Sequence, residues 1–251
     1  MSENSNIFLY GKGIFTTVSI VSGGPFLWAK HWQKLITNAE TIGIDLVGFS
    51  QGSVLEELRQ RIAEAGISNG RARLTFADQQ NAAIWPDSEP ADAKTTLKII
   101  AGENRAIPDN FTLTVSPFPV NSRSPLSGVK SCNYLENLMA VEDAKTRGFH
   151  EAVRVNDFGS VTSAAMANVF WLKGGELFTP SLATGCLAGT TREFVLERID
   201  CREVEAGIEV LDSADAIYLT SAGLGIVPVR EYNGREMLDP EHQITGLLAG
   251  R

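Results

Sequence analysis

A short run at residues 189–193 combines a glycine, two hydroxyl side chains and a glutamate ahead of an apolar segment. Thr190 with Glu193 three positions later has the pattern of a capping box, which predicts the start of a helix. A helix start leaves backbone N–H groups unpaired and carries the positive end of the helix dipole. With Gly189 permitting close approach and hydroxyls at Thr190 and Thr191, the run predicts a phosphate-binding turn. An ordinary capped helix that binds nothing is the alternative.

Lys130 lies between a segment rich in proline and serine and the start of a predicted helix. A lysine that bonds covalently to a carbonyl carbon needs partial desolvation, because burial lowers the pKa of its amine. The apolar residues around Lys130 permit that burial but do not require it. The alternative is a solvated lysine at a helix entry.

Two further segments carry polar groups that could bind a ligand. Residues 159–163 form a loop of small side chains that leads into an apolar strand containing Asn168, and such a loop lets a flat ring approach the backbone. A tightly packed turn is the alternative there. His31 and Lys34 lie on a predicted helix, where ordinary surface groups are the alternative.

The elements that must position these residues form two groups. Hydrophobic periodicity predicts strands at 14–20, 26–28, 71–77, 97–101 and 111–116, helices at 30–42 and 54–65, and a loop at 78–93. Residues 117–128 carry three prolines and several serines, which favours a linker between domains. Beyond it we expect helices at 134–147 and 191–199 with strands between and after them. The sequence therefore predicts two domains of mixed α and β structure, at 1–120 and 121–251.

The composition excludes several functional classes. Hydrophobic residues make up 43% of the 251 residues and the formal net charge is -8, which disfavours binding to nucleic acid or to an anionic membrane surface. Neither a signal peptide nor a membrane-spanning run is visible, so we expect a cytoplasmic protein. No disulfide framework or metal site is predicted, because the cysteines and histidines are few and scattered. They are Cys132, Cys186, Cys201, His31, His150 and His242.

Six segments, taken in order, resemble motifs of the fold-type IV pyridoxal-phosphate (PLP) enzymes, the class IV aminotransferase family. Residues 11–15 resemble the family's Gly-x-Gly-x-Phe strand, and residues 31–35 its His-x-x-Arg-Leu helix. Lys130, Asn133 and Leu135 match the PLP lysine that precedes Asn-x-Leu. Residues 189–192 match the family's Gly-x-Thr-Arg phosphate helix, and residues 214–229 match its last active-site strand and turn. The family's Gly-x-Val-x-Glu, Asn-x-Phe and Thr-Pro motifs are matched in order by Gly159 and Val161, Asn168 and Phe170, and Thr179 and Pro180.

This resemblance implies a fold, a cofactor and a set of site residues. The implied fold is α+β with two domains, a small N-terminal α/β domain at 1–120 and a larger β-barrel-like PLP-binding domain with flanking helices at 121–251. Lys130 would hold PLP as a Schiff base and act as general base and acid on the substrate. The implied cofactor-binding residues are Lys34, Lys130, Ser163, Asn168, Gly189, Thr190, Thr191 and Thr220 or Ser221, and the implied substrate-binding residues are Thr17 and Arg192. The implied partners are a small amino substrate and a second copy of the chain in a homodimer, with no metal.

Within the family, three details most resemble the 4-amino-4-deoxychorismate lyases. They are the two-residue gap between Lys130 and Asn133, the Leu135–Glu136 pair and residues 167–171. Such a lyase releases pyruvate and forms 4-aminobenzoate, a folate precursor. The alternative is an aminotransferase of amino acid metabolism that acts on branched-chain or D-amino acids.

Three departures from the family pattern bear on activity. Ser163 stands where the family has the glutamate that keeps the PLP ring nitrogen protonated, so the ring is expected to be a weaker electron sink. Lys34 replaces an arginine and loses its bidentate fork. The sequence also begins close to the Gly-x-Gly-x-Phe strand, so the family's usual first hairpin is expected to be missing. A weakened or non-catalytic homologue with a binding or regulatory role is therefore a second alternative.

Overall fold

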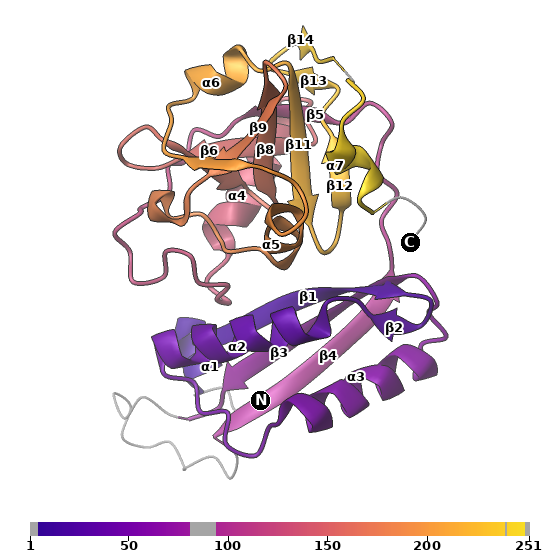
Figure 1. Cartoon of the computed structure of the whole chain (residues 1–251). Coiled ribbons are helices and arrows are strands. Elements are labelled where there is room, and N and C mark those ends of the chain that lie inside the picture. Colours follow the sequence, from indigo (N-terminus) through magenta and orange to yellow (C-terminus); the bar gives the residue numbers. More distant parts are fainter. Residues whose placement is uncertain (1–4, 81–93, 239, 249–251) are drawn as a thin grey trace. The chain divides into compact units, whose positions relative to one another are not determined.

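The computed structural model describes residues 5–80, 94–238 and 240–248, and the chain divides into two compact units (Figure 1). Unit 1 consists of Met1–Asn104 and Val129–Tyr134, and unit 2 of Arg105–Gly128 and Leu135–Arg251. Each unit has its own sheets and hydrophobic core. The segment that carries Lys130 thus belongs to unit 1, although unit 2 flanks it on both sides in the sequence. A domain boundary between residues 120 and 121 stays a prediction.

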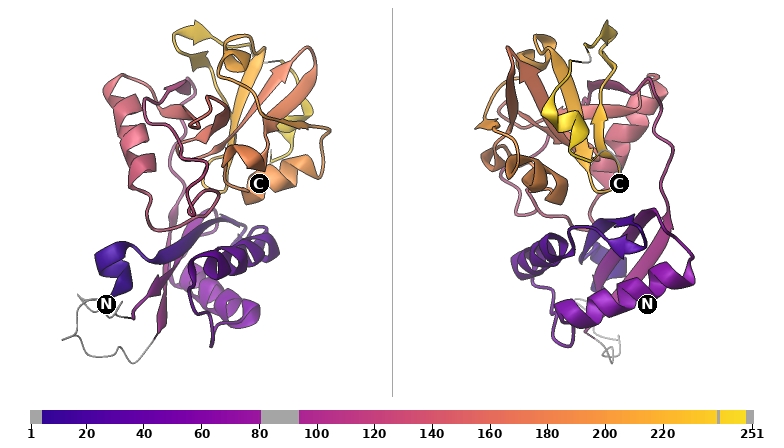
Figure 2. Two further views of the ribbon diagram at one scale, coloured as in Figure 1. Left: turned by 90° about the vertical axis from the view of Figure 1, so that its left-hand side faces the viewer. Right: turned by 45° about the vertical axis from the view of Figure 1, so that its right-hand side comes forward.

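Unit 1 is built on one antiparallel sheet in the order β2-β1-β3-β4. Its strands are β1 (Gly13–Val21), β2 (Gly24–Pro25), β3 (Gly70–Asp78) and β4 (Thr95–Glu103), and its helices are α1 (Asn6–Tyr10), α2 (Trp28–Ile42) and α3 (Gln51–Glu64). Helices α2 and α3 lie along the sheet (Figures 1 and 2). Their apolar side chains share one core with Ile14 and Val18 of β1 and Leu74 of β3.

Successive side chains of β1 point alternately to the two faces of the sheet, one toward the core and one away from it. Ile14, Val18 and Ile20 enter the core beneath the helices. Phe15 and Thr17 alternate with them and therefore belong to the opposite face of the sheet. That second face carries the polar and aromatic groups of the candidate site.

The strand predicted at 14–20 and the helices predicted at 30–42 and 54–65 are confirmed with small changes at their ends. The strand predicted at 26–28 is wrong, because β2 follows the Ser22–Gly23 turn directly and α2 already begins at Trp28. Leu27 adopts a left-handed conformation with φ of 54°, which ends the extended segment before the helix. Residues 81–93 of the predicted loop lie outside the described residues.

Unit 2 contains two five-stranded sheets with mixed strand directions. One has the order β10-β9-β8-β11-β12 and consists of Arg202–Val204, Glu176–Pro180, Asn168–Lys173, Ala216–Ser221 and Gly225–Pro228. The other has the order β14-β13-β5-β6-β7 and consists of Arg235–Glu236, Glu231–Tyr232, Thr112–Val115, Glu151–Val155 and Val161–Ala164. The helices of this unit are α4 (Leu135–Thr146), η1 (Leu182–Thr184), α5 (Thr190–Leu196), α6 (Glu209–Asp212) and α7 (Gln243–Gly246).

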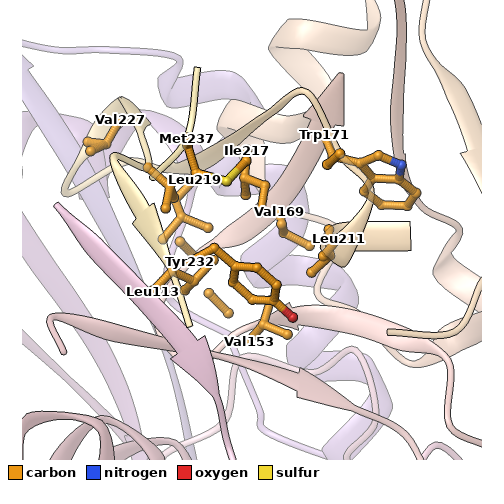
Figure 3. Close-up of a cluster of buried hydrophobic side chains, with 14 of the residues drawn as sticks. Leu113, Val153, Val169, Trp171, Leu211, Ile217, Leu219, Val227, Tyr232 and Met237 are labelled. Atoms are coloured by element: carbon orange, nitrogen blue, oxygen red, sulfur yellow. The ribbon is translucent and has the colours of Figure 1, made fainter. Parts of the chain in front are cut away.

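The main core of unit 2 takes side chains from both of its sheets (Figure 3). Leu113 and Val153 of the second sheet join Val169 and Ile217 of the first in one buried cluster. A smaller cluster places Val195 of α5 and Ile244 of α7 against buried residues of β8 and β11. The predicted mixed α and β fold is confirmed. Within the described part of the chain, no helix combines the length and the apolarity needed to cross a bilayer.

Candidate active site

Backbone hydrogen bonds attach the segment around Lys130 to the start of β1. The N–H of Phe15 donates to the carbonyl of Lys130 at 3.0 Å, and the N–H of Cys132 donates to the carbonyl of Gly13 at 2.8 Å. Ile14 and Ser131 form an antiparallel bridge between these bonds. The lysine is thus held by a short added piece of sheet and not by a free loop.

Two of the motifs recognised in the sequence touch each other in unit 1. The side-chain amide of Asn133 donates to the carbonyl of Gly11 at 3.2 Å. Gly11 has φ of +66°, and a Cβ at this position would lie 2.7 Å from Oδ1 of Asn133. A glycine is required there both by the backbone conformation and by the close approach. The pair fixes the chain immediately after Lys130.

Aromatic groups surround the amine of Lys130. Its Nζ lies 4.5 Å from the ring centroid of Phe15, 4.9 Å from that of Tyr134 and 3.4 Å from the Tyr134 hydroxyl. The two rings meet edge to face at 5.1 Å. The guanidinium of Arg73 lies 3.6 Å from the centroid of Phe15. Two cations therefore share one aromatic ring, and both are attracted to its negative faces.

This environment prepares Lys130 for chemistry at neutral pH. Burial, followed by the charge of Arg73, lowers the pKa of Lys130 from 10.5 to about 8. Desolvation and a neighbouring cation both disfavour the ammonium form. A substantial neutral fraction is thus present near physiological pH, as a nucleophilic or proton-accepting amine requires.

His31 is a buried member of the same unit, with 2% of its surface exposed. Its Nδ1 lies 2.7 Å from the hydroxyl of Thr16. Burial, then the charges of Lys34 and Lys130, lower the pKa of His31 to about 3, so the ring is neutral. The surface alternative is therefore wrong for His31. Lys34 is half-buried on the same helix.

In unit 2, the run at 189–193 begins helix α5, but the predicted capping box is wrong. The N-cap residue is Gly189, and the structure gives it no side-chain cap. Thr190 is already inside the helix, and the N–H of Glu193 donates to the carbonyl of Gly189 at 2.9 Å. Thr190 and Thr191 are both buried. The turn is closed by backbone bonds, which leaves the phosphate role of the two threonines a prediction.

Asn168 packs tightly against Gly189. A Cβ added to Gly189 would lie 2.1 Å from Oδ1 of Asn168. The amide of Asn168 donates to the carbonyl of Leu187 at 2.7 Å, so this side chain cannot move away freely. Asn168 also pairs with Thr220 across β8 and β11. The structure thus brings together three residues that the sequence predicted for one cofactor site.

Thr220 and Ser221 differ in their accessibility. The Thr220 side chain has 0% of its surface exposed, and its hydroxyl has no hydrogen-bond partner among the described residues. Ser221 is half-buried and accepts a bond from the N–H of Leu224 at 3.2 Å. Of the two alternatives for a phosphate ligand, burial favours Ser221.

Arg192 is occupied by contacts inside unit 2. It is buried, donates to the carbonyl of Pro180 at 2.8 Å and forms an ion pair with Glu203. These bonds give the guanidinium a structural role at the junction of α5, β9 and β10. Its contact with substrate stays a prediction.

Ser163 lies on β7 directly opposite Arg154 on β6. Arg154 is buried, and its Nη2 donates to Glu136 at 3.1 Å. The sequence identified the missing glutamate at Ser163 but not the arginine beside it. Arg73 and Tyr134 were also missed. Each of these three residues is brought to its position by strand pairing or by the course of the chain, which no local motif records.

A family model described as Amino-transferase class IV matches residues 13–232. The chain belongs to this family. Its members are PLP-dependent enzymes, so the predicted recognition, enzyme class and cofactor are confirmed at the level of the family. The individual site residues stay predictions.

Similar proteins include both kinds of family enzyme. Aminodeoxychorismate lyase of Bacillus subtilis is 28% identical over 230 residues, which cover 88% of this chain and 78% of that protein. D-alanine aminotransferase of Staphylococcus epidermidis is 24% identical over 241 residues, with 92% and 83% covered. An aminotransferase of Brucella abortus, solved with bound PLP, superposes with a TM-score of 0.84 at 22% identity, covering 98% of this chain and 90% of that one. This last likeness shows that the folds agree.

The residues of this chain fit the family's cofactor. Lys130 offers an amine with a lowered pKa beside two aromatic rings, which suits a bond to an aldehyde. Gly189 and Asn168 form a close-packed turn where a larger residue at 189 has no room. The lysine is a group of the kind that PLP requires, whereas the contact of Gly189 with Asn168 is packing within the fold.

Proposed function

We propose that this protein is a PLP-dependent 4-amino-4-deoxychorismate lyase, which forms 4-aminobenzoate and pyruvate for the folate pathway. The observation that carries the proposal is the amine of Lys130, whose pKa is lowered to about 8 among aromatic rings. The similarity to the lyase of Bacillus subtilis over 88% of the chain supports this choice of substrate.

The proposed cofactor residues are those that the family resemblance implies. Lys130 would bind PLP covalently, with Lys34 supplying positive charge for its phosphate. Ser163, Asn168, Gly189, Thr190, Thr191 and Ser221, with Thr220 as the buried alternative to Ser221, are the proposed contacts in unit 2. When bound, PLP withdraws electrons from the substrate carbon that carries the amine.

The proton transfers are proposed for Lys130. Its neutral amine would remove the proton from the substrate carbon that bears the nitrogen. The bond between the substrate ring and the enolpyruvyl oxygen would then break, and the substrate ring would become aromatic. Lys130, now an ammonium, would give its proton to the leaving enolpyruvate, which becomes pyruvate.

We propose that two residues on the second face of the sheet in unit 1 orient the substrate. Thr17 of β1 pairs directly with Arg73 of β3. We assign the hydroxyl of Thr17 to substrate binding and the guanidinium of Arg73 to a substrate carboxylate, because Arg recognises carboxylates through paired N–H donors.

Ser163 favours elimination over transamination. Without a carboxylate near the ring nitrogen, the cofactor stabilises a carbanion less well. Formation of an aromatic product offsets this weakness in the lyase reaction, whereas amino-group exchange yields no aromatic ring. The alternative is an aminotransferase for branched-chain or D-amino acids, which the similarity to D-alanine aminotransferase supports.

The decisive experiment measures both reactions on one preparation. The protein reconstituted with PLP is assayed for pyruvate release from aminodeoxychorismate and for amino-group exchange with pairs of amino acids and 2-oxo acids. Pyruvate without exchange supports the lyase, and exchange without pyruvate supports the aminotransferase. Absence of both reactions in PLP-loaded protein would identify a non-catalytic homologue.

The covalent bond is tested separately with borohydride, which reduces the imine and fixes the cofactor to its lysine. Lys130→Ala is expected to abolish the adduct. Lys98→Ala serves as the matched control, since Lys98 is an exposed lysine of β4 in the same unit. An adduct that persists in Lys130→Ala refutes the assignment of the lysine.

We further propose a homodimer in the cytoplasm. The support is the resemblance to the family, whose members are homodimers, and the similarity to metabolic enzymes of amino acid and aminodeoxychorismate chemistry. Light scattering of the purified holoenzyme tests the dimer, and a mass of one chain at micromolar concentration would contradict it.

A further inference from the structure

We infer that Arg154 is the side chain that meets the ring nitrogen of bound PLP and that it holds this nitrogen unprotonated. The inference rests on the proposed function, because it requires that unit 2 binds the cofactor. Arg154 would thus be a contact of the PLP ring nitrogen that is not part of the family motif.

The register of the sheet places Arg154 next to Ser163, the position at which the family has its glutamate. Arg154 is the direct partner of Ser163 across β6 and β7. Residues directly opposite in an antiparallel pair share one face, with Cβ atoms about 5 Å apart. A side chain as long as arginine therefore reaches the space that the shorter serine does not fill.

Arg154 is a buried cation with incomplete compensation. Its side chain is 4% exposed, whereas that of its ion-pair partner Glu136 is 74% exposed. Its Nε donates to the carbonyl of Phe118 at 3.1 Å, and its Nη2 donates to Pro119 at 3.0 Å and to Glu136 at 3.1 Å. No described residue accepts a hydrogen bond from Nη1. A buried guanidinium is stabilised when all of its donors are used, so a ligand acceptor at Nη1 completes the set.

The short side chain of Ser163 leaves the space beside Nη1 of Arg154 open to a ligand. Its side chain is half-buried, and no hydrogen bond to its hydroxyl occurs among the described residues. The polar groups at this point of the sheet are thus a serine hydroxyl and a guanidinium, where the motif predicts a carboxylate.

Arginine fixes the protonation state of the ring nitrogen. It only donates hydrogen bonds and stays charged at all physiological pH values. A pyridine nitrogen accepts such a bond through its lone pair and therefore must be unprotonated. Protonation would place two cations together in a partly desolvated site, which is unfavourable. The bound ring is then a weaker electron sink, which agrees with the proposed elimination.

The test uses the holoenzyme reconstituted with ¹⁵N-labelled PLP. In the wild-type protein, nitrogen NMR is expected to show an unprotonated pyridine at every pH from about 6 to 9, since arginine does not titrate in this range. Arg154→Gln keeps a polar side chain of similar shape, and Arg154→Leu removes the donor altogether. Both variants are expected to shift the resonance toward the protonated form at the acid end of the range and to weaken PLP binding roughly 10-fold or more.

Two further variants sharpen the comparison. The double variant Arg154→Ala with Ser163→Glu is expected to give a protonated ring. Arg202→Leu removes an exposed arginine of β10 that pairs with Glu176, and it is expected to leave the resonance unchanged.

Two results would overturn the inference about Arg154, and a third would refute the proposed function on which it rests. A protonated ring in the wild-type protein, or an unchanged resonance in both single variants at Arg154, removes Arg154 from this role. A wild-type protein that binds no PLP and forms no borohydride adduct refutes the proposed function, and the inference with it. Because ring protonation is read only from bound cofactor, the two failures are distinct.

Discussion

The hydroxyl of Thr16 and Nδ1 of His31 lie 2.7 Å apart in the buried part of unit 1. The contact joins β1 to α2, and it lies on the face of the sheet that packs against the helices. Since Phe15 and Thr17 point the other way, the Thr16–His31 pair fixes the strand from behind. It holds in place the residues that surround Lys130.

The first prediction concerns stability at acid pH. The pKa of His31 is about 3 in the folded protein, against 6.5 for a histidine free of its surroundings, so folding favours the neutral ring. The stabilisation is complete above the unfolded value of 6.5 and is lost progressively as the pH falls from there toward about 3. From about pH 7.5 to about pH 5, the wild type should lose ~2 kcal/mol of unfolding free energy through this group.

Urea denaturation of the wild type and of His31→Gln at both pH values measures the difference. The variant should lose less stability on acidification, because glutamine does not titrate. Thr16→Ser, which keeps the hydroxyl, should retain the wild-type pH dependence. Equal slopes for the wild type and His31→Gln would show that His31 is not the titrating group.

A second prediction concerns the pair of cations on Phe15. Arg73 is the second cause of the lowered pKa of Lys130, after burial. Arg73→Met should therefore raise the pKa of Lys130 above about 8, although burial keeps it below its ordinary value. Each unit of increase lowers the neutral fraction of the amine about tenfold at a pH well below the pKa.

The rate at which an amine-reactive reagent modifies Lys130 in PLP-free protein, followed by peptide mass spectrometry across pH, measures this shift. Arg59→Met, at an exposed arginine of α3, is the matched control and should leave the profile unchanged. A profile in Arg73→Met that coincides with the wild type would assign the whole shift to burial.

A third prediction separates Thr220 from Ser221. The buried hydroxyl of Thr220 has no partner in the described structure, so Thr220→Val should change the free energy of unfolding by less than about 1 kcal/mol. It should also leave the affinity for PLP unchanged. Ser221→Ala should weaken PLP binding roughly 10-fold, because a hydrogen bond to a charged phosphate is lost.

Absorbance titration with PLP and thermal melting of the apoprotein provide both quantities. Weaker PLP binding in Thr220→Val than in Ser221→Ala would reverse the assignment.

The sequence predicted Lys130 because its signal is local, a lysine followed at fixed spacing by Asn133 and Leu135. Arg73 could not be found in this way. It reaches the site through the pairing of β1 with β3, which places it opposite Thr17, and a contact of a cation with Phe15 has no sequence pattern. Arg154 was missed for a related reason, since its pairing with Ser163 depends on a register that shifts at the next residue.

The run at 189–193 illustrates the opposite case, in which a clear pattern gave the right element and the wrong detail. Helix α5 begins where the pattern predicts a helix, but Gly189 and not Thr190 takes the N-cap position. The deciding contact is with Asn168, more than twenty positions earlier in the chain, which a local pattern cannot include. The physical need for a glycine at 189 thus comes from packing between segments.

The fourth prediction tests this packing between Asn168 and Gly189. In Gly189→Ala the new methyl group meets Oδ1 of Asn168, whose amide is held by Leu187. The variant should lose ~1–3 kcal/mol of unfolding free energy through overpacking. Asn168→Ala should be destabilised as well, because it removes the hydrogen bond to Leu187.

A double-mutant cycle isolates the contact itself. In the variant with both substitutions, the space vacated at 168 receives the added methyl group, so the combined loss should be smaller than the sum by about 1 kcal/mol or more. Gly246→Ala is the control, since a Cβ there meets nothing within 4 Å and the change should stay within about 0.5 kcal/mol. Strictly additive losses would show that the turn moves away from Asn168 at little cost, so that the two residues are not coupled.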